Sequence, residues 1–130
     1  MKKIQIAVLA AALVLASRPL FAHHGYAAAF DSTKVIKFSG KVNEFVWRNP
    51  HCRLVLDGTD ETGKPITYTI ELGSPGVLVK YGMTRNLFSP GSEVGMEVHA
   101  SRTNPSFGVR IGKVWVDGKE LPGAERAGAN

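Results

Sequence analysis

Hydrophobic and polar residues alternate along most of the chain after residue 33, with the two-residue period of strands that bury one face. Glycine, proline and other turn residues separate the runs. The runs that this pattern predicts as strands are 34–42, 52–57, 66–72, 94–100 and 107–116. A tight-turn pair, Asp117–Gly118, then precedes Glu120–Leu121, which could add a short closing strand.

In the first run, the alternation of apolar and polar positions shifts by one residue near its end. Trp47 falls out of phase with Val42, so the sequence predicts either a bulge near residues 43–44 or a bend at Gly40. Asn49–Pro50 then interrupts the pairing, because proline has no backbone N–H to donate to a neighbouring strand.

Between the third and fourth runs the pattern changes to that of a short helix. Ser74 can cap it and Pro75 suits its first position, with 77–81 as the body and Gly82 as the stop. Three strands, a short helix and two more strands follow the order of an OB-type barrel. The sequence therefore predicts a mainly β fold, an OB-type five-stranded antiparallel barrel with one short helix between strands three and four.

The start of the chain has the layout of a secretory signal peptide. Two lysines precede an apolar run at 6–16, and the segment ends on a small residue, Ala22. The run is shorter than the ~20 apolar residues of a spanning helix, which favours cleavage over a retained membrane anchor. We expect cleavage after Ala22, with Pro19 as the breaker inside the signal, and cleavage after Ala16 is the alternative.

These segments predict the organisation of the chain and its compartment. Residues 1–22 form the signal peptide, 23–33 an N-terminal arm, 34–121 the barrel and 122–130 a flexible tail. The mature protein would be periplasmic or secreted, with no stable membrane span. The formal charge of +5 includes three basic residues of the leader, so the mature surface is nearly balanced and gives no reason to expect nucleic acid as a partner. The single cysteine excludes an internal disulfide.

Short motifs in a fixed order make the chain similar to a known family. They are His23-His24, Phe30-Asp31, Gly40-Lys41-Val42, Trp47 with Asn49-Pro50-His51, Gly73-Ser74-Pro75, and Pro90-Gly91. With these motifs the mature chain resembles the small exported bacterial proteins of domain-of-unknown-function family 6152. The resemblance implies a periplasmic OB-type barrel and brings no activity with it. Gly25 and Cys52 depart from the family's usual serine and bulkier apolar residue, so any role of Cys52 would belong to this chain alone.

Cleavage after Ala22 would place a free amine and an imidazole on one residue, His23. These two nitrogens can chelate one metal ion, His24 adds a second imidazole, and His51 could supply a third if the arm folds back. Amine and imidazole nitrogens suit Cu(II). The hypothesis is a copper site made by His23 with His24 or His51. The alternative is a flexible histidine pair with incidental affinity and an exposed barrel histidine at 51.

Other notable residues fit structural roles. Cys52 shares a face with Leu54 and is expected to pack in the core as a small apolar group. His99 alternates onto the outward face of its strand and is expected to be solvated. Trp47 and Asn49 could shape a ligand surface at the barrel mouth, although packing and turn formation explain them too.

The sequence thus predicts a small binding module and not an enzyme. It shows neither a serine–histidine–aspartate arrangement nor a pair of acids suited to general acid–base work. The preferred ligand is a metal ion, Cu(II), near the mature N-terminus. The alternative is a scaffold or interaction protein of the envelope that binds a polypeptide or glycan on the barrel face, and an enzyme using a histidine-bound copper ranks third.

Overall fold

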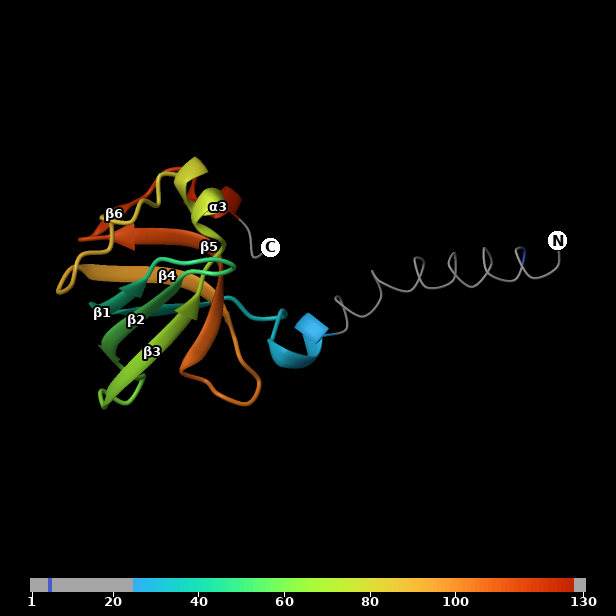
Figure 1. The fold of residues 1–130 in the computed structure, drawn as a ribbon. Helices are drawn as coiled ribbons and strands as arrows, with labels where there is room; N and C mark the ends of the chain where they lie inside the picture. The colour runs from blue at the N-terminus through green and yellow to red at the C-terminus, as the bar shows by residue number, and fades with distance from the viewer. Residues whose placement is uncertain (1–4, 6–24, 128–130) are drawn as a thin grey trace.

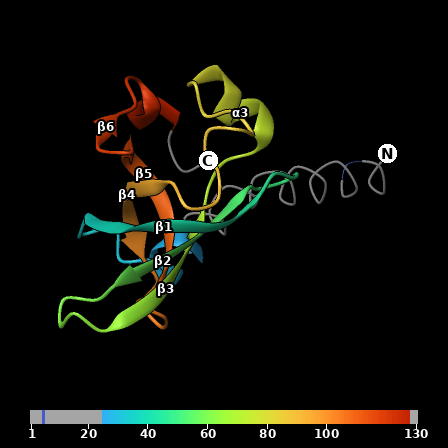
Figure 2. The ribbon, with the colours of Figure 1, turned by 90° about the vertical axis from the view of Figure 1, so that its left-hand side faces the viewer.

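Five strands wind into a barrel in the part of the chain that the structure, a computed structural model, describes, namely Gln5 and residues 25–127 (Figure 1). The strands of the barrel are β1 (Ile36–Val46), β2 (Arg53–Thr59), β3 (Pro65–Glu71), β4 (Glu93–Ala100) and β5 (Phe107–Val116). The strand order is β3-β2-β1-β4-β5, and an additional β3–β5 pairing closes the barrel (Figures 1 and 2). The predicted OB-type barrel is confirmed. His23, His24 and nearly all of the predicted signal peptide lie outside the described residues.

The strand pair that closes the barrel is parallel, whereas the sequence led us to expect antiparallel pairing throughout. Thr69 of β3 is opposite Phe107 of β5, and Glu71 is opposite Val109. Two antiparallel steps separate each of these strands from β1, so both run in the direction of β1 and can pair only in parallel. The closing contact is short and holds together one end of β3 and one end of β5.

Strand β1 belongs to both halves of the barrel. Its first part pairs with β4 and its last part with β2, and the register with β2 shifts between Val42 and Glu44. The predicted bulge is confirmed, and it explains why Trp47 is out of phase with Val42. Gly40 lies at a close approach of β1 to β2, and a Cβ there would lie 2.5 Å from the backbone oxygen of Asp57.

We expect Gly40→Ala to lower the free energy of unfolding by about 1–3 kcal/mol, the usual cost of forcing extra atoms into a packed site. The added methyl group would push apart two backbones, which cannot rotate away as a flexible side chain would. Urea unfolding measures the change, with Gly76→Ala as the matched control because a Cβ at Gly76 meets nothing within 4 Å. Equal stability of the two variants would contradict the close approach.

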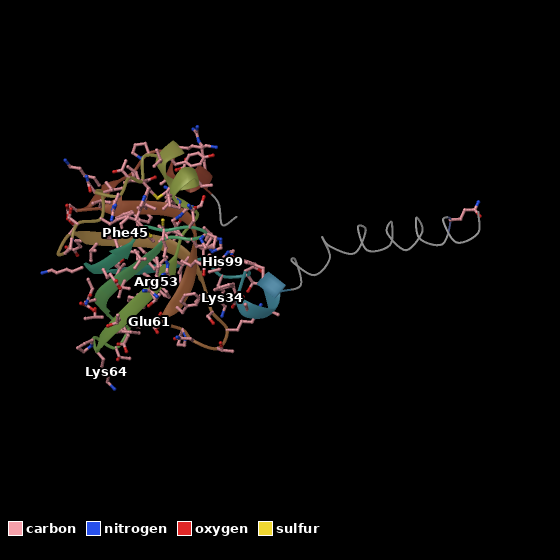
Figure 3. All side chains as sticks on the ribbon, in the orientation of Figure 1. Lys34, Phe45, Arg53, Glu61, Lys64 and His99 are labelled. Carbon is pink, nitrogen blue, oxygen red and sulfur yellow. The ribbon has the colours of Figure 1, made fainter. Side chains whose placement is uncertain are left out.

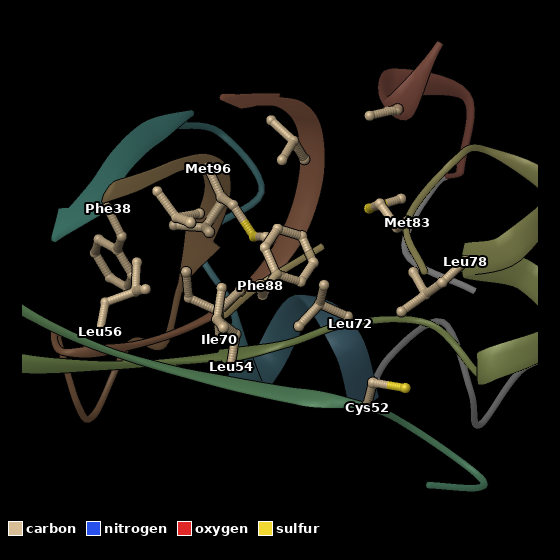
Figure 4. Close-up of a cluster of buried hydrophobic side chains, with 14 of the residues drawn as sticks. Phe38, Cys52, Leu54, Leu56, Ile70, Leu72, Leu78, Met83, Phe88 and Met96 are labelled. Atoms are coloured by element: carbon tan, nitrogen blue, oxygen red, sulfur yellow. The ribbon is translucent and has the colours of Figure 1, made fainter. Parts of the chain in front are cut away.

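The barrel interior is filled by side chains that alternate inward along the strands (Figure 4). Leu54 and Leu56 of β2 are fully buried, and Cys52 beside them is buried as predicted. The end of the barrel near Cys52 is covered by the segment that follows β3, which contributes Leu78, Met83 and Phe88.

The short helix α3 (Pro75–Lys80) begins at the predicted cap. The Ser74 hydroxyl accepts a hydrogen bond from the Val77 backbone N–H at 3.4 Å, and Pro75 occupies the first turn. Gly82 follows with a φ of +78°, the left-handed conformation that ends a helix. Among the helices of the described chain, none combines the length and the apolar character that crossing a membrane requires.

The segment after Pro122, predicted to be a flexible tail, is packed against the barrel as far as Ala127. It follows the two-residue strand β6 (Lys119–Glu120) and forms the 3-10 helix η1 (Ala124–Ala127), both of whose alanines are buried. The Arg110 guanidinium, on β5, donates hydrogen bonds to the carbonyl oxygens of Ala124 and Ala127. A run of small and polar residues gives no sign of this docking, because the partner side chain comes from another strand.

Candidate metal-binding site

The N-terminal arm is attached to one end of the barrel. Residues 25–29 are helical, and Phe30 then forms a bridge with Ser101 just after β4. The Asp31 N–H donates to the Ala100 carbonyl at 2.9 Å, and the Phe30 ring meets the Phe107 ring at 5.9 Å between centroids. The arm therefore does fold back onto the barrel from Tyr26 onward.

Arg102 holds the same segment from the other side. Its guanidinium Nε donates to the Ala27 carbonyl at 2.9 Å, and its backbone N–H donates to the Ala29 carbonyl at 2.9 Å. These two bonds satisfy carbonyls at the end of the short helix, which have no partner within it. Arg102 also lies 3.7 Å from the Asp31 carboxylate, and the side chain and backbone of Thr33 lower the pKa of that carboxyl by hydrogen bonding to it.

His51 is paired with a carboxylate at this end of the barrel. It precedes β2, and its Nδ1 is hydrogen-bonded to Oε1 of Glu71, the last residue of β3. The side chains are 46% and 36% exposed, so solvent and other ligands can reach the pair. An ionised carboxylate accepts hydrogen bonds only, so Nδ1 is the donor. Neutral His51 then carries its free lone pair on Nε2, the arrangement found in metal-ligating histidines.

Residues of the arm and of the barrel meet in a small pocket next to this pair. Tyr26 and Phe30 line it from the arm, and His51, Glu71 and Val109 line it from the barrel. Its volume is about 110 Å³, well below the ~300–1,000 Å³ of pockets that hold organic ligands. Arg110 also lines it, and the described lining residues whose side chains could bind an ion are Tyr26, His51 and Glu71.

A larger and more open pocket adjoins the same pair on its other side. It has a volume of about 320 Å³ and shares His51 and Glu71 with the small pocket. Arg48, Arg53 and Phe107 also line it. The His51–Glu71 pair thus stands between a basic recess and the docked arm.

Cys52 does not add a thiolate to this group. The residue is fully buried, and its Sγ lies 3.9 Å from the Arg48 carbonyl oxygen as a weak donor. Burial raises the pKa of the Cys52 thiol, so the thiol keeps its proton at neutral pH and is a poor metal ligand or nucleophile.

His99 differs from its prediction. It is half-buried and only partly solvated, and Figure 3 shows it at the side of the barrel where the arm attaches. Its Nδ1 is hydrogen-bonded to the Tyr26 hydroxyl at 2.8 Å, and the two rings meet edge to face at 6.1 Å. Strand alternation alone predicted the direction of His99 correctly but could not reveal what covers it.

Trp47 and Asn49 are not among the residues that line the two pockets containing His51. Trp47 is partly buried and packs its ring against Phe45 at 5.7 Å, as part of the barrel's packing. Asn49 is exposed and joins Pro50 through a cis peptide bond. Arg48 and Pro50, the neighbours of Asn49 in the chain, do line the larger pocket, and a ligand surface at Trp47 and Asn49 stays a prediction.

The described residues contain no group of three or more His, Cys, Asp and Glu side chains placed to hold one metal ion. Of the histidines proposed for copper, only His51 is described, and the structure therefore gives no position for His23 or His24. Sequence reasoning missed two residues of the site, Glu71 and Tyr26. Glu71 is an ordinary outward residue of β3, and only the pairing of the strands places it beside His51.

One comparison with known proteins gives a match. The family described as "Family of unknown function (DUF6152)" matches residues 10–110 of the chain. No curated protein matches. No solved structure matches either.

Proposed function

We propose that this chain, which belongs to the family of unknown function DUF6152, is an exported binding module that holds one Cu(II) ion between its mature N-terminus and His51. Export follows from the leader pattern at 1–22, whose removal would leave His23 first and the protein in the periplasm or outside the cell. The role is binding, not catalysis.

The observation that carries this proposal is the position of the arm. Tyr26 lines the same pocket as His51, and His23 precedes Tyr26 by three residues. Residues 25–29 are helical, so the proposal needs only the two residues before Gly25, at about 3.3–3.6 Å each when extended, to bring the mature N-terminus to His51. His51 would meet it with Nε2, since Glu71 occupies Nδ1.

The proposed Cu(II) ion would be bound by nitrogen ligands from the mature N-terminus and from a second histidine. The amine and the imidazole of His23 would chelate the ion, and His51 or His24 would add another imidazole. Nitrogen ligands of this kind favour Cu(II) over the other divalent first-row ions. The Glu71 carboxylate would orient the His51 ring and increase the basicity of its free nitrogen, as outer carboxylates do at histidine metal sites.

A competition titration of the mature protein with Cu(II) and a chelator of known affinity tests the proposal. We expect His23→Ala to weaken binding by at least about ten- to a hundredfold, since even the loss of an outer partner costs that much. Lys34→Ala is the control, because it changes an exposed residue directly after the arm.

A synthetic peptide of residues 23–29 separates this proposal from incidental affinity. The peptide has His23 and His24 but lacks His51. We expect the whole protein to bind Cu(II) more tightly than the peptide does, and more tightly than its own His51→Ala variant. Equal affinities would mean that the barrel adds nothing and that the histidine pair is a flexible chelator.

The recess beside His51 favours a second candidate, an envelope protein that binds a polypeptide or glycan. Its volume of about 320 Å³ lies within the range of pockets for organic ligands, and two arginines and Phe107 line it. Such a role would not need the metal. Metal-free protein that retains an envelope polypeptide or glycan, and loses it on Arg48→Ala with Arg53→Ala, would support this candidate.

A further inference from the structure

The larger recess beside His51 lies on the outer face of the barrel, where β2 and β3 pair. Arg53 of β2 is directly opposite Glu71 of β3, and residues in such positions point to the same face. Leu54, the residue after Arg53, is fully buried. Because adjacent strand residues alternate, Arg53 and Glu71 point outward, and both line this recess of about 320 Å³.

Two connecting segments complete the recess. Arg48, Pro50 and His51 line it from the segment that joins β1 to β2, and Phe107 lines it from the start of β5, directly after the segment that joins β4 to β5. In OB folds, ligands bind on the face of strands two and three and on the loops that join strands one to two and four to five. The recess therefore lies where this fold offers a ligand site.

The lining of the recess carries a net positive charge. Two arginines against one glutamate leave one positive charge while His51 is neutral. Arg53 lies 3.7 Å from the Glu44 carboxylate, but both side chains are exposed, so this ion pair is weak. Within the described chain, the Arg48 side chain has no ion pair or hydrogen bond. Both guanidinium groups can therefore turn to a ligand, and their planar fork matches a carboxylate.

The recess also contains a hydrogen-bond acceptor. Glu71 is bonded to His51 through Oε1, but an ionised carboxylate has about four lone-pair sites and can accept from further donors. Its negative charge repels a second anionic group on the ligand. A well-matched ligand therefore has one negative charge for the arginines and hydroxyl groups that donate to Glu71.

Phe107 adds an apolar surface beside these polar groups. The residue is half-buried, its ring meets the Phe30 ring at 5.9 Å between centroids, and its backbone position is opposite Thr69 of β3. These contacts hold the ring before a ligand binds, which reduces the entropy lost on binding. A sugar ring has C–H groups on its faces and hydroxyls around its edge, so it can lie on Phe107 and still donate to Glu71.

We propose that the recess binds a sugar acid, a hydroxylated ring with one carboxylate, whose carboxylate pairs with Arg48 and Arg53 and whose hydroxyls donate to Glu71. This inference rests on the second candidate function, ligand binding at the recess, and needs neither Cu(II) nor the mature N-terminus. It narrows that candidate from a polypeptide or glycan to an acidic sugar. A free monosaccharide and a unit of a longer glycan share this chemistry.

An amide chemical-shift titration of the mature protein, with a chelator present to remove metal ions, tests the inference with three ring compounds. Galacturonate has the carboxylate and the hydroxyls, galactose lacks the carboxylate, and cyclohexanecarboxylate lacks the hydroxyls. We expect galacturonate to bind at least about tenfold more tightly than the other two, since each of them leaves a charged side chain of the recess without a partner. Shifts at His51, Arg53 and Phe107 would locate the binding. Galactose or cyclohexanecarboxylate binding as tightly as galacturonate would overturn the inference.

Variants of the recess assign the groups. Arg48→Ala and Arg53→Ala should each weaken galacturonate binding by about tenfold. Arg85→Ala is the matched control, because Arg85 is exposed and does not line the recess. Glu71→Gln should weaken galacturonate binding but strengthen cyclohexanecarboxylate binding, since only the sugar uses the carboxylate as an acceptor. Tighter binding of both compounds by Glu71→Gln would overturn the role of the hydroxyls.

Two further ligands distinguish the sources and the competing class. A galacturonate trimer that binds more tightly than the monomer would support a glycan, and equal affinities would support a free sugar acid. A short glutamate peptide that binds at the recess more tightly than either would overturn the inference and leave the second candidate standing as a polypeptide binder. Absence of binding by all of these compounds would also overturn the inference. The second candidate fails separately, if metal-free protein retains neither an envelope polypeptide nor a glycan.

Discussion

Replacing Arg110 by methionine is expected to lower the free energy of unfolding by about 2–6 kcal/mol, because the two carbonyl acceptors of η1 lose their donor at about 1–3 kcal/mol each. Arg110 is 1% exposed, although it belongs to a residue type that is almost never fully buried unless paired. Its Nη1 donates to the carbonyls of Gly112 and Ala124, each at 3.0 Å, and its Nη2 donates to Ala127.

Methionine fills much of the same volume but donates no hydrogen bond. The carbonyls of η1 would then remain buried without these donors, at about 1–3 kcal/mol for each buried group left unsatisfied. Otherwise η1 would leave the barrel and expose the surface that its two alanines now cover. The protein will adopt the less costly of these two states, and both are less stable than the wild type. Burial lowers the pKa of Arg110, because desolvation disfavours the charged form of the guanidinium.

Urea unfolding measures the loss, and Arg85→Met is the matched control because Arg85 is exposed. Such surface changes are usually within about 0.5 kcal/mol of neutral. A chain ending at Gly123 lacks η1, and Arg110→Met should cost little more in that background. An Arg110→Met protein as stable as the control, or a full loss repeated in the shortened chain, would contradict the role of Arg110 in docking η1.

The barrel could be predicted because its signals are local. Alternation over a few residues marks each strand, the misfit of Trp47 with Val42 marks the bulge, and Ser74–Pro75 marks the start of α3. Each of these three signals comes from residues that are neighbours in the sequence, whose local preferences agree with the final fold. The direction of the closing β3–β5 pair also follows from the strand order, once the parity of the antiparallel steps is counted.

The packing of the C-terminal segment could not be predicted, because its cause lies on another strand. Small residues after Pro122 look like a frayed end, and Arg110 looks like an outward residue of an interrupted strand. Only the three-dimensional structure brings the guanidinium to the carbonyls of η1.

The candidate site was predicted in part. His51 was singled out as a possible third imidazole for the ion, and the structure adds Glu71 as its partner. The pairing of β2 with β3 decides that contact, and no sequence spacing encodes it. Tyr26 was not singled out, because the arm carries no periodic pattern, although its hydrogen bond to His99 fixes it to β4.

Adding the residues Ser-Pro-Pro in front of His23 is expected to weaken Cu(II) binding more than a hundredfold, beyond the ~10–100-fold lost with an outer partner. The extension leaves all four histidines of the chain in place and moves only the α-amine away from the imidazole of His23. Proline has no backbone N–H, so the added residues cannot supply an amide nitrogen as a substitute ligand.

The matched control carries the same three residues after Asn130, where they change composition equally but leave the amine of His23 free. Mass spectrometry of each purified protein confirms its first residue, and competition titration at one fixed pH compares the affinities. The pH must be held constant because amine and imidazole ligands release protons as they bind. Equal affinity of the two extended proteins would refute chelation by the amine and the side chain of one residue. An affinity that also survives His51→Ala would leave the barrel without any part in binding the ion.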